Sequence, residues 1–304
     1  MSLVNYKPHV AVLLAAYNGM RWIEEQIASI LCQRAVDVVV YISVDLSSDG
    51  TLAWCQELSQ RDSRVIVLPD TGERYGGAAK NFFRLIKDVD FSNFDYVSYA
   101  DQDDIYLEDK YRAAHETIIS RGCAAYSSNA TAYWPDGRKV LLVKSQRQRK
   151  YDFLFEAGGP GCSYVLRVAE ALEFKNFLLH NWQKTNEVGL HDWLTYAWFR
   201  SAGKKWHIDK RSYILYRQHG GNQIGANNGI SGIRSRLALL SSGWYRSEFM
   251  KISNLVGRDV PGLPASFLDE GAFPKRFLIF NFNEFRRSAR DRLAFGFLAF
   301  FGFM

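Results

Sequence analysis

The sequence predicts an α/β protein with a mostly parallel central sheet flanked by helices, followed by a helical extension. In the first half, continuous apolar runs alternate with segments whose apolar residues repeat at helical spacing, which is the pattern of a parallel sheet. Beyond about Ile224 the pattern is helical to the end of the chain. The 304 residues are 47% apolar and 23% charged, which is enough for a large core. We therefore expect a sheet-containing domain over residues 1–225 and a helical extension over residues 226–304.

The first half is expected to form four strands joined by three helices. Each strand is a short apolar run, as suits a strand buried on both faces. The strands are predicted at Val10–Ala16, Val38–Val44, Val65–Leu68 and Tyr96–Ala100. The helices are predicted to follow Asn18, Asp49 and Gly76-Gly77, the first two being residue types that cap helix N-termini. Right-handed crossovers then make the sheet parallel.

The second half shows weaker periodicity. Strands are predicted within Cys123–Trp134, at Cys162–Leu166 after a glycine-rich turn, and at Tyr213–Tyr216. A helix is predicted at Leu190–Ala202, with Gly203 as its stop.

Charge and cysteine content indicate a cytoplasmic protein with an anionic partner. The net charge is +6 and the isoelectric point near 9.0, which favours nucleotides, nucleic acid or an acidic membrane surface. Nucleic acid is least favoured, because the basic residues are not gathered with aromatics into a recognisable module. The four cysteines form no CxxC pair and are expected to be reduced. We find neither a signal-peptide pattern nor an apolar run of membrane-spanning length.

Polar loops follow three of the predicted strands. They are Ala16–Gly19, Asp45–Thr51 and Asp101–Asp104. In a parallel sheet these loops share the carboxyl edge, where ligands bind. The third loop has three carboxylates in four residues, and hard divalent cations take oxygen ligands. A cation held at this edge would bind a diphosphate.

Seven segments together carry a family resemblance, through their order and spacing. They are Ala15–Gly19, Ser43–Thr51, Arg74–Asn81, Asp101–Asp104, Gly161–Tyr164, His191–Trp193 and Tyr216–His219. This set resembles the family 2 inverting glycosyltransferases, which have a GT-A nucleotide-diphospho-sugar-binding fold, and most of all their rhamnosyltransferase-like branch. The resemblance spans roughly residues 9–225.

The resemblance implies a donor and metal site at the edge of the sheet. It assigns Asp103, of a DXD motif, and His219 to a Mg²⁺ or Mn²⁺ ion, which stabilises the charge of a departing diphosphate. A nucleoside diphosphate sugar of the dTDP or UDP type would be bound by Ala16, Tyr17, Asn18, Asp45, Asn81, Asp101, Asp104 and Arg217. Asp45 would accept the N–H of a pyrimidine. Val44 and Leu46 stand where many members have Asp and Gly, which leaves the contact with the base open.

The resemblance assigns Asp192 as the catalytic base. Asp192 would take the proton of the acceptor hydroxyl as that oxygen attacks the anomeric carbon opposite the diphosphate, which inverts the configuration. From the residues alone, an Asp in a first helical turn is equally well explained as a partner of the helix dipole. Gly161, Cys162, His191 and Trp193 would line the acceptor side. Gly220-Gly221-Asn222 is expected to be a lid ordered by donor binding.

The C-terminal extension combines an apolar stripe with positive charge. Leu278, Phe282, Phe285, Ala289 and Leu293 share one helical face, and several arginines lie among them. This pattern fits a peripheral helix at the inner face of the cell membrane, a helix packed on the main domain, or a homodimer contact.

The expected function is metal-dependent, inverting transfer of L-rhamnose from dTDP-L-rhamnose onto a cell-surface polysaccharide such as O-antigen, or onto a lipid-linked glycan. Alternatives are transfer of another sugar, such as galactofuranose or glucose, and a non-catalytic nucleotide-sugar-binding protein. A sugar-phosphate nucleotidylyltransferase is disfavoured, because Ala16–Met20 lacks the glycine-rich, basic phosphate loop that such an enzyme needs after its first strand.

Overall fold

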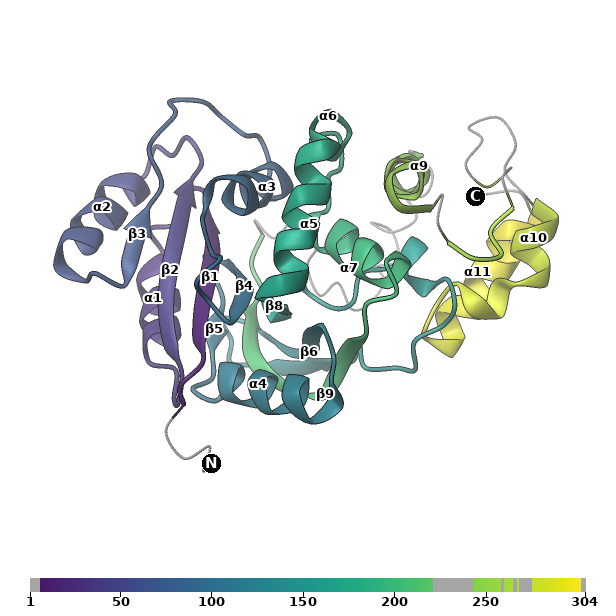
Figure 1. Cartoon of the computed structure of the whole chain (residues 1–304), viewed down its shortest axis with the longest axis horizontal. Helices are drawn as coiled ribbons and strands as arrows, with labels where there is room; N and C mark the ends of the chain where they lie inside the picture. Colours follow the sequence, from purple (N-terminus) through teal and green to yellow (C-terminus); the bar gives the residue numbers. More distant parts are fainter. Residues whose placement is uncertain (1–5, 221–242, 258–259, 265–266, 268–274, 302–304) are drawn as a thin grey trace.

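A nine-stranded sheet with helices on both faces organises the part of the chain that the computed structural model describes, namely residues 6–220, 243–257, 260–264, 267 and 275–301. The strand order is β3-β2-β1-β4-β8-β6-β9-β5, and β7 pairs with β6. The N-terminal strands lie at one end of the molecule and the helices α10 (Lys275–Phe280) and α11 (Ala289–Phe301) at the other (Figure 1). The predicted α/β architecture is confirmed.

The sheet is parallel at its N-terminal end and mixed beyond it. Its strands are β1 (His9–Ala16), β2 (Asp37–Val44), β3 (Val65–Val67), β4 (Tyr96–Asp101), β5 (Ile105–Tyr106), β6 (Ala125–Tyr133), β7 (Lys139–Leu142), β8 (Val165–Arg167) and β9 (Trp206–Arg217). Strands β1 to β4 pair in parallel, as predicted. Strand β8 runs antiparallel to both β4 and β6, so it links the two halves of the sheet.

The side chains of β1 alternate between two hydrophobic cores, one on each face of the sheet, and each core is covered by a layer of helices. Val12 and Leu14 belong to the core beneath α1 (Ile23–Leu31), α2 (Thr51–Arg61) and α4 (Lys110–Arg121). Ala11 and Leu13 belong to the core on the other face, beneath α3 (Ala78–Asp88), α5 (Val168–His180) and α7 (His191–Ser201). All four side chains are fully buried, because strand side chains point alternately to the two faces and both faces are covered.

The structure differs from the sequence prediction mainly in the second half. The predicted strand Cys162–Leu166 divides into a short 3₁₀ helix, η2 (Gly161–Ser163), and β8. The predicted last strand, Tyr213–Tyr216, is the end of β9, which begins at Trp206. Helices α4 and α5 were not predicted, because their buried faces do not stand out from the polar residues around them in sequence.

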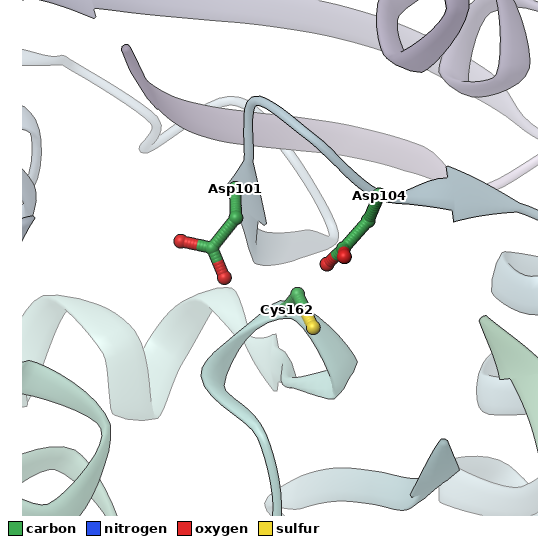
Figure 2. Close-up of side chains that lie close together, drawn as sticks. All are labelled: Asp101, Asp104 and Cys162. Carbon is green, nitrogen blue, oxygen red and sulfur yellow. The ribbon is translucent and has the colours of Figure 1, made fainter. Parts of the chain in front are cut away.

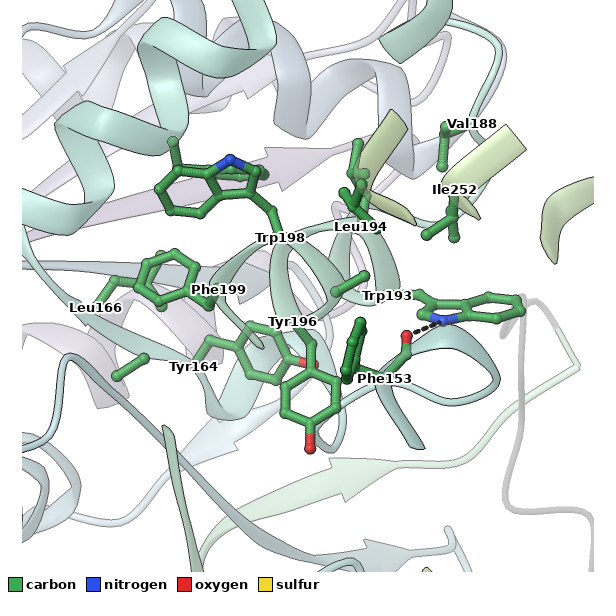
Figure 3. Packing of buried hydrophobic residues seen from close by; sticks show 14 of the residues in the cluster. Phe153, Tyr164, Leu166, Val188, Trp193, Leu194, Tyr196, Trp198, Phe199 and Ile252 are labelled. Atoms are coloured by element: carbon green, nitrogen blue, oxygen red, sulfur yellow. Dashed lines mark hydrogen bonds between the residues drawn. The ribbon is translucent and has the colours of Figure 1, made fainter. Parts of the chain in front are cut away.

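The C-terminal helices complete the core around α7. Phe285 is fully buried and its ring lies 5.0 Å from that of Phe155 and 5.3 Å from that of Phe295. Figure 3 shows the neighbouring aromatic side chains of α7, where the Trp193 indole donates to the carbonyl of Phe153 in the 3₁₀ helix η1 (Asp152–Leu154). The described part of the extension therefore packs on the main domain. The predicted boundary between residues 225 and 226 lies outside the described residues.

The predicted apolar stripe of the extension is divided between core and surface. Leu278 and Phe285 are buried, whereas Leu293 is 69% exposed and Phe280, outside the stripe, is 83% exposed. Helix α9 (Trp244–Val256) precedes these segments, and η5 (Phe282–Glu284) lies between α10 and α11. In the described residues, no helix has both the length and the apolar character needed to cross a membrane.

Candidate functional site

The three polar loops predicted from the sequence meet at the carboxyl edge of the parallel strands. Ala15 of β1 is in register with Asp101 of β4, and Ala16 with Val44 of β2. The Gln102 side chain accepts from the backbone N–H of Tyr17 at 2.7 Å and donates to the Tyr17 carbonyl at 2.8 Å. The first and third loops are thus tied to each other by hydrogen bonds.

Asp45 is buried between its own loop and the segment that precedes α3. Its carboxylate accepts backbone N–H groups from Leu46 at 2.8 Å, Tyr75 at 2.8 Å and Gly76 at 3.2 Å. A carboxylate has about four lone-pair sites, so one remains for a further donor such as a base N–H. The Arg74 guanidinium lies 5.2 Å from the centroid of the Tyr17 ring, and Tyr17 is 40% exposed. The Tyr17 and Arg74 side chains therefore lie side by side, and Arg74 directly precedes Tyr75, whose N–H binds Asp45. Donor contact by Asp45 stays a prediction.

Asn18 and Asn81 hold this edge together. Asn18 adopts a left-handed φ of 46°, which asparagine tolerates, and its side chain accepts the N–H of Ser48 at 2.9 Å. The buried Asn81 donates to the carbonyls of Ala16 at 3.3 Å and Ser43 at 3.0 Å. Both side chains support the loops, and their donor contacts stay predictions.

The acidic loop after β4 concentrates negative charge in a confined space. Figure 2 shows the carboxylates of Asp101 and Asp104 pointing toward the same space, with Cys162 of η2 beside them. One ligand atom of each of these three residues lies within 4.8 Å of the others. Burial, Asp103 and Asp192 together raise the pKa of Asp101 to about 8. Burial, Asp103 and Asp101 raise the pKa of Asp104 well above its ordinary range.

Cys162 is completely buried beside these acids. Burial and the charges of Asp104 and Asp101 raise the pKa of its thiol well above the ordinary value, so the sulfur stays protonated. A protonated thiol is a poor ligand for a hard cation, so within this group only the carboxylate oxygens suit such an ion. The predicted role of Cys162 on the acceptor side stays a prediction.

The end of β9 brings Arg217 and His219 to the acidic loop. His219 Nε2 lies 2.7 Å from Asp103 Oδ2, so the two predicted metal ligands are neighbours. The Arg217 side chain donates to the Asp103 carbonyl at 2.8 Å and forms an ion pair with Glu25. The His219 ring stacks on Trp22, with 4.1 Å between centroids.

Trp22 and Glu25, at the start of α1, contact the predicted site residues His219 and Arg217. The sequence did not reveal these contacts. Glu25 has the pattern of an acid favoured by the helix dipole, and its partner lies 192 residues away.

Asp192 is partly exposed in the first turn of α7, between the buried side chains of His191 and Trp193. Its Oδ1 accepts the N–H of Trp193 at 2.8 Å. Burial raises the pKa of Asp192 to about 6, against the opposing effects of the Trp193 N–H and the Lys144 charge. Because Asp192 in turn raises the pKa of Asp101, the two carboxylates lie within each other's electrostatic field.

The remaining predicted acceptor residues pack against one another. A Cβ on Gly161 would lie 2.8 Å from His191 Nε2, so only glycine fits there. The His191 ring stacks on Phe82 at 3.8 Å, and burial lowers its pKa to about 3, which keeps the ring neutral. The Trp193 indole N–H already has a partner in the Phe153 carbonyl at 2.9 Å. Acceptor contact by these residues stays a prediction. Of the predicted lid, Gly221 and Asn222 lie outside the described residues.

The α/β fold, the strand-end acidic loop and an aspartate on α7 whose charge acts on that loop are the features of a GT-A-type glycosyltransferase. The glycosyl transferase family 2 model matches residues 11–168. The chain therefore belongs to glycosyltransferase family 2 and is a glycosyltransferase. The predictions of family, fold and enzyme class are confirmed.

Similarity to individual proteins adds detail to the family assignment. The chain is 41% identical over 280 residues to the dTDP-rhamnosyl transferase RfbG of Shigella flexneri, covering 92% of this chain and 96% of the relative. It is 30% identical over 165 residues to the putative teichuronic acid biosynthesis glycosyltransferase TuaG of Bacillus subtilis, covering 54% of this chain and 64% of the relative. Residues 1–349 of S. aureus TarS, solved in complex with UDP, share the fold with a TM-score of 0.55 at 15% identity, covering 94% of this chain and 73% of TarS 1–349.

Proposed function

We propose that this protein transfers L-rhamnose from dTDP-L-rhamnose to a cell-surface or lipid-linked glycan, with inversion at the anomeric carbon. The observation that carries the donor is the 41% identity to a dTDP-rhamnosyl transferase over nearly the full length of both chains. This similarity favours rhamnose over galactofuranose or glucose. The presence of an ionisable, partly exposed aspartate beside the acidic loop favours a catalytic over a purely binding role.

Asp192 acts as the general base in this proposal. Its pKa of about 6 leaves it ionised at neutral pH, yet close enough to the working pH to accept a proton efficiently. The Trp193 N–H occupies one carboxylate oxygen and orients the group. Asp192 takes the proton of the acceptor hydroxyl as the new C–O bond forms and the bond to the diphosphate breaks on the opposite side.

The acidic loop fits a divalent cation. Asp104 Oδ2 is buried and has no hydrogen-bond partner among the described residues. Burial, together with the neighbouring acids, raises the pKa of Asp101 and of Asp104. The carboxylates of Asp101, Asp103 and Asp104, with His219, would hold Mg²⁺ or Mn²⁺ there. Such an ion supplies Lewis-acid stabilisation to the departing diphosphate. Asp45 and Tyr17 bind the base.

A donor screen and an Asp192→Asn variant test the proposal. Among dTDP-L-rhamnose, UDP-galactofuranose and UDP-glucose, each with Mn²⁺, we expect the first to give the largest rise in thermal midpoint, since only ligands bound to the native state stabilise it. Asp192→Asn should retain donor affinity and lose turnover by about 10²- to 10⁴-fold, the usual contribution of a general base.

Asp37→Asn is the matched control, because Asp37 begins β2 at the opposite edge of the sheet and is exposed. Turnover by Asp192→Asn equal to that of the control would refute the base assignment. A larger stabilisation by either UDP-sugar would refute the donor.

A further inference from the structure

We propose that Arg287, in the C-terminal extension, is a positioning residue for the catalytic base Asp192. This inference joins the extension to the reaction, and its catalytic part rests on the proposed role of Asp192. The match to the family 2 model ends at residue 168, well before Arg287. The Arg287 side chain is nevertheless buried inside the domain, since the residue is only 3% exposed. A guanidinium buried this deeply needs acceptors, because an unpaired buried charge is costly.

The acceptors of Arg287 all lie on one segment of the main domain, residues 152–157. The guanidinium donates to Asp152 Oδ2 at 3.1 Å and to the carbonyl of Ala157 at 2.6 Å. It also forms an ion pair with Glu156 at 3.3 Å, and the backbone N–H of Arg287 donates to Glu156 Oε1 at 2.6 Å. Because the guanidinium is planar and its donors point in fixed directions, it holds both ends of this segment in one geometry.

The buried carboxylate of Asp152 connects this segment to helix α7. Asp152 accepts the Tyr196 hydroxyl at 3.0 Å and the Arg200 guanidinium at 3.0 Å. Tyr196 and Arg200 both belong to α7, whose first turn carries Asp192. Arg287 and α7 therefore share one carboxylate, which fixes the helix relative to the extension.

A second connection runs from the end of the segment to Asp192 itself. The N–H of Gly158 donates to the Tyr164 hydroxyl at 2.9 Å. That hydroxyl lies 3.3 Å from the carbonyl of Asp192 and equally far from that of Gly159, so the two carbonyls share its proton. A Cβ on Gly161 would lie 3.1 Å from Asp192 Cβ, so the backbone of residues 158–161 packs directly against the proposed base. Movement of this backbone would therefore displace Asp192.

The position of Asp192 matters more for turnover than the ion pairs of Arg287 matter for stability. A displacement of about 1 Å can cost up to about 100-fold in rate, because a general base has to stay within hydrogen-bond reach of the attacking hydroxyl. A buried ion-pair network often adds little net stability compared with apolar side chains of the same volume. Arg287 therefore contributes a fixed geometry for residues 152–161 and for the first turn of α7.

Hydrogen exchange in Arg287→Met tests this geometry, and it needs no acceptor substrate. We expect faster exchange than in the wild type for peptides that cover residues 157–164 and 190–196, while the rest of the sheet changes less. Ile118→Ala is the matched control, because Ile118 is fully buried in the core on the opposite face of the sheet and its loss destabilises the fold without touching this network. Tyr164→Phe removes only a hydroxyl, should loosen the same two peptides, and decides the question if Arg287→Met does not fold.

The catalytic consequence is measured as release of dTDP from dTDP-L-rhamnose with Mn²⁺ and with water as the acceptor. In this reaction water attacks the anomeric carbon, gives a proton to Asp192 and displaces dTDP. Arg287→Met should bind dTDP within about twofold of the wild type and release it from the sugar nucleotide about tenfold more slowly, because only the base has moved. Ile118→Ala, assayed well below its thermal midpoint, should match the wild type in both measurements.

Three results would overturn the inference: wild-type exchange in both peptides of Arg287→Met, an equal increase in Ile118→Ala, or an undiminished rate of dTDP release by Arg287→Met. Failure of the folded wild-type protein to bind dTDP would overturn the proposed donor instead. The exchange result would then still decide whether Arg287 holds Asp192 in place.

Discussion

Replacing Asp101 with asparagine should stabilise the metal-free protein near neutral pH. Asp101 has its pKa raised from 3.8 to about 8 by burial, Asp103 and Asp192. Folding therefore takes up a proton between these pH values, and the free energy of unfolding falls as the pH rises from about 4 to about 8. At 1.36 kcal/mol per pH unit, this cost reaches at most about 4 kcal/mol at pH 7. Because Asp101 is partly exposed, solvent screening reduces our expectation to about 1–2 kcal/mol.

Thermal unfolding in the presence of a chelator measures this effect. At pH 7, Asp101→Asn should melt about 2–6 °C above the wild type. The difference should shrink as the pH falls toward about 4, below which the wild-type carboxyl is protonated in both states. Mn²⁺ should raise the wild-type midpoint more than that of the variant, because the variant lacks one oxygen and the negative charge of a proposed ligand. Asp37→Asn, far from the acidic loop, is the control. An Asn variant that is no more stable than the wild type at pH 7, or a difference independent of pH, would refute the electrostatic reasoning.

Three further outcomes are expected. Turnover at saturating donor should fall about tenfold per pH unit below about pH 6, because the raised pKa of Asp192 leaves this carboxyl protonated there. A turnover that does not change from pH 5 to pH 8 would contradict the role of Asp192 as general base. Phe285→Ala should lower the free energy of unfolding by about 3–5 kcal/mol, because the ring is fully buried. Phe280→Ala should change it by less than about 0.5 kcal/mol, because that ring is exposed. Equal effects of the two substitutions would show that the C-terminal extension is not part of the core. The third outcome concerns membrane contact by the exposed face of α11. The wild-type protein should sediment together with phosphatidylglycerol vesicles at low salt, and a double variant with Leu293→Ser and Arg290→Glu should do so to a smaller extent. Equal sedimentation of the two proteins would rule out contact through this face.

Local sequence pattern was sufficient for the parallel half of the fold and for the edge of the sheet at which the candidate site lies. Apolar runs such as Val10–Ala16 are buried on both faces of a sheet, and the loops that follow them necessarily share an edge once the strands are parallel. Asp101–Asp104 could therefore be placed at the carboxyl edge of the sheet without knowledge of the structure. The family, fold and enzyme class followed from the same segments.

Only the tertiary structure decided which side chains are available to a ligand and which support the site. Glu25 meets Arg217 and Trp22 meets His219 across nearly 200 residues of sequence. Such pairings depend on how strands far apart in the chain are ordered in the sheet, and a periodic pattern does not encode that order. Burial then determines the chemistry. In one helical turn the Asp192 carboxyl is left ionisable near neutral pH, while the adjacent His191 is packed on an aromatic ring and kept uncharged, because removal from water disfavours charge wherever no compensating partner is near.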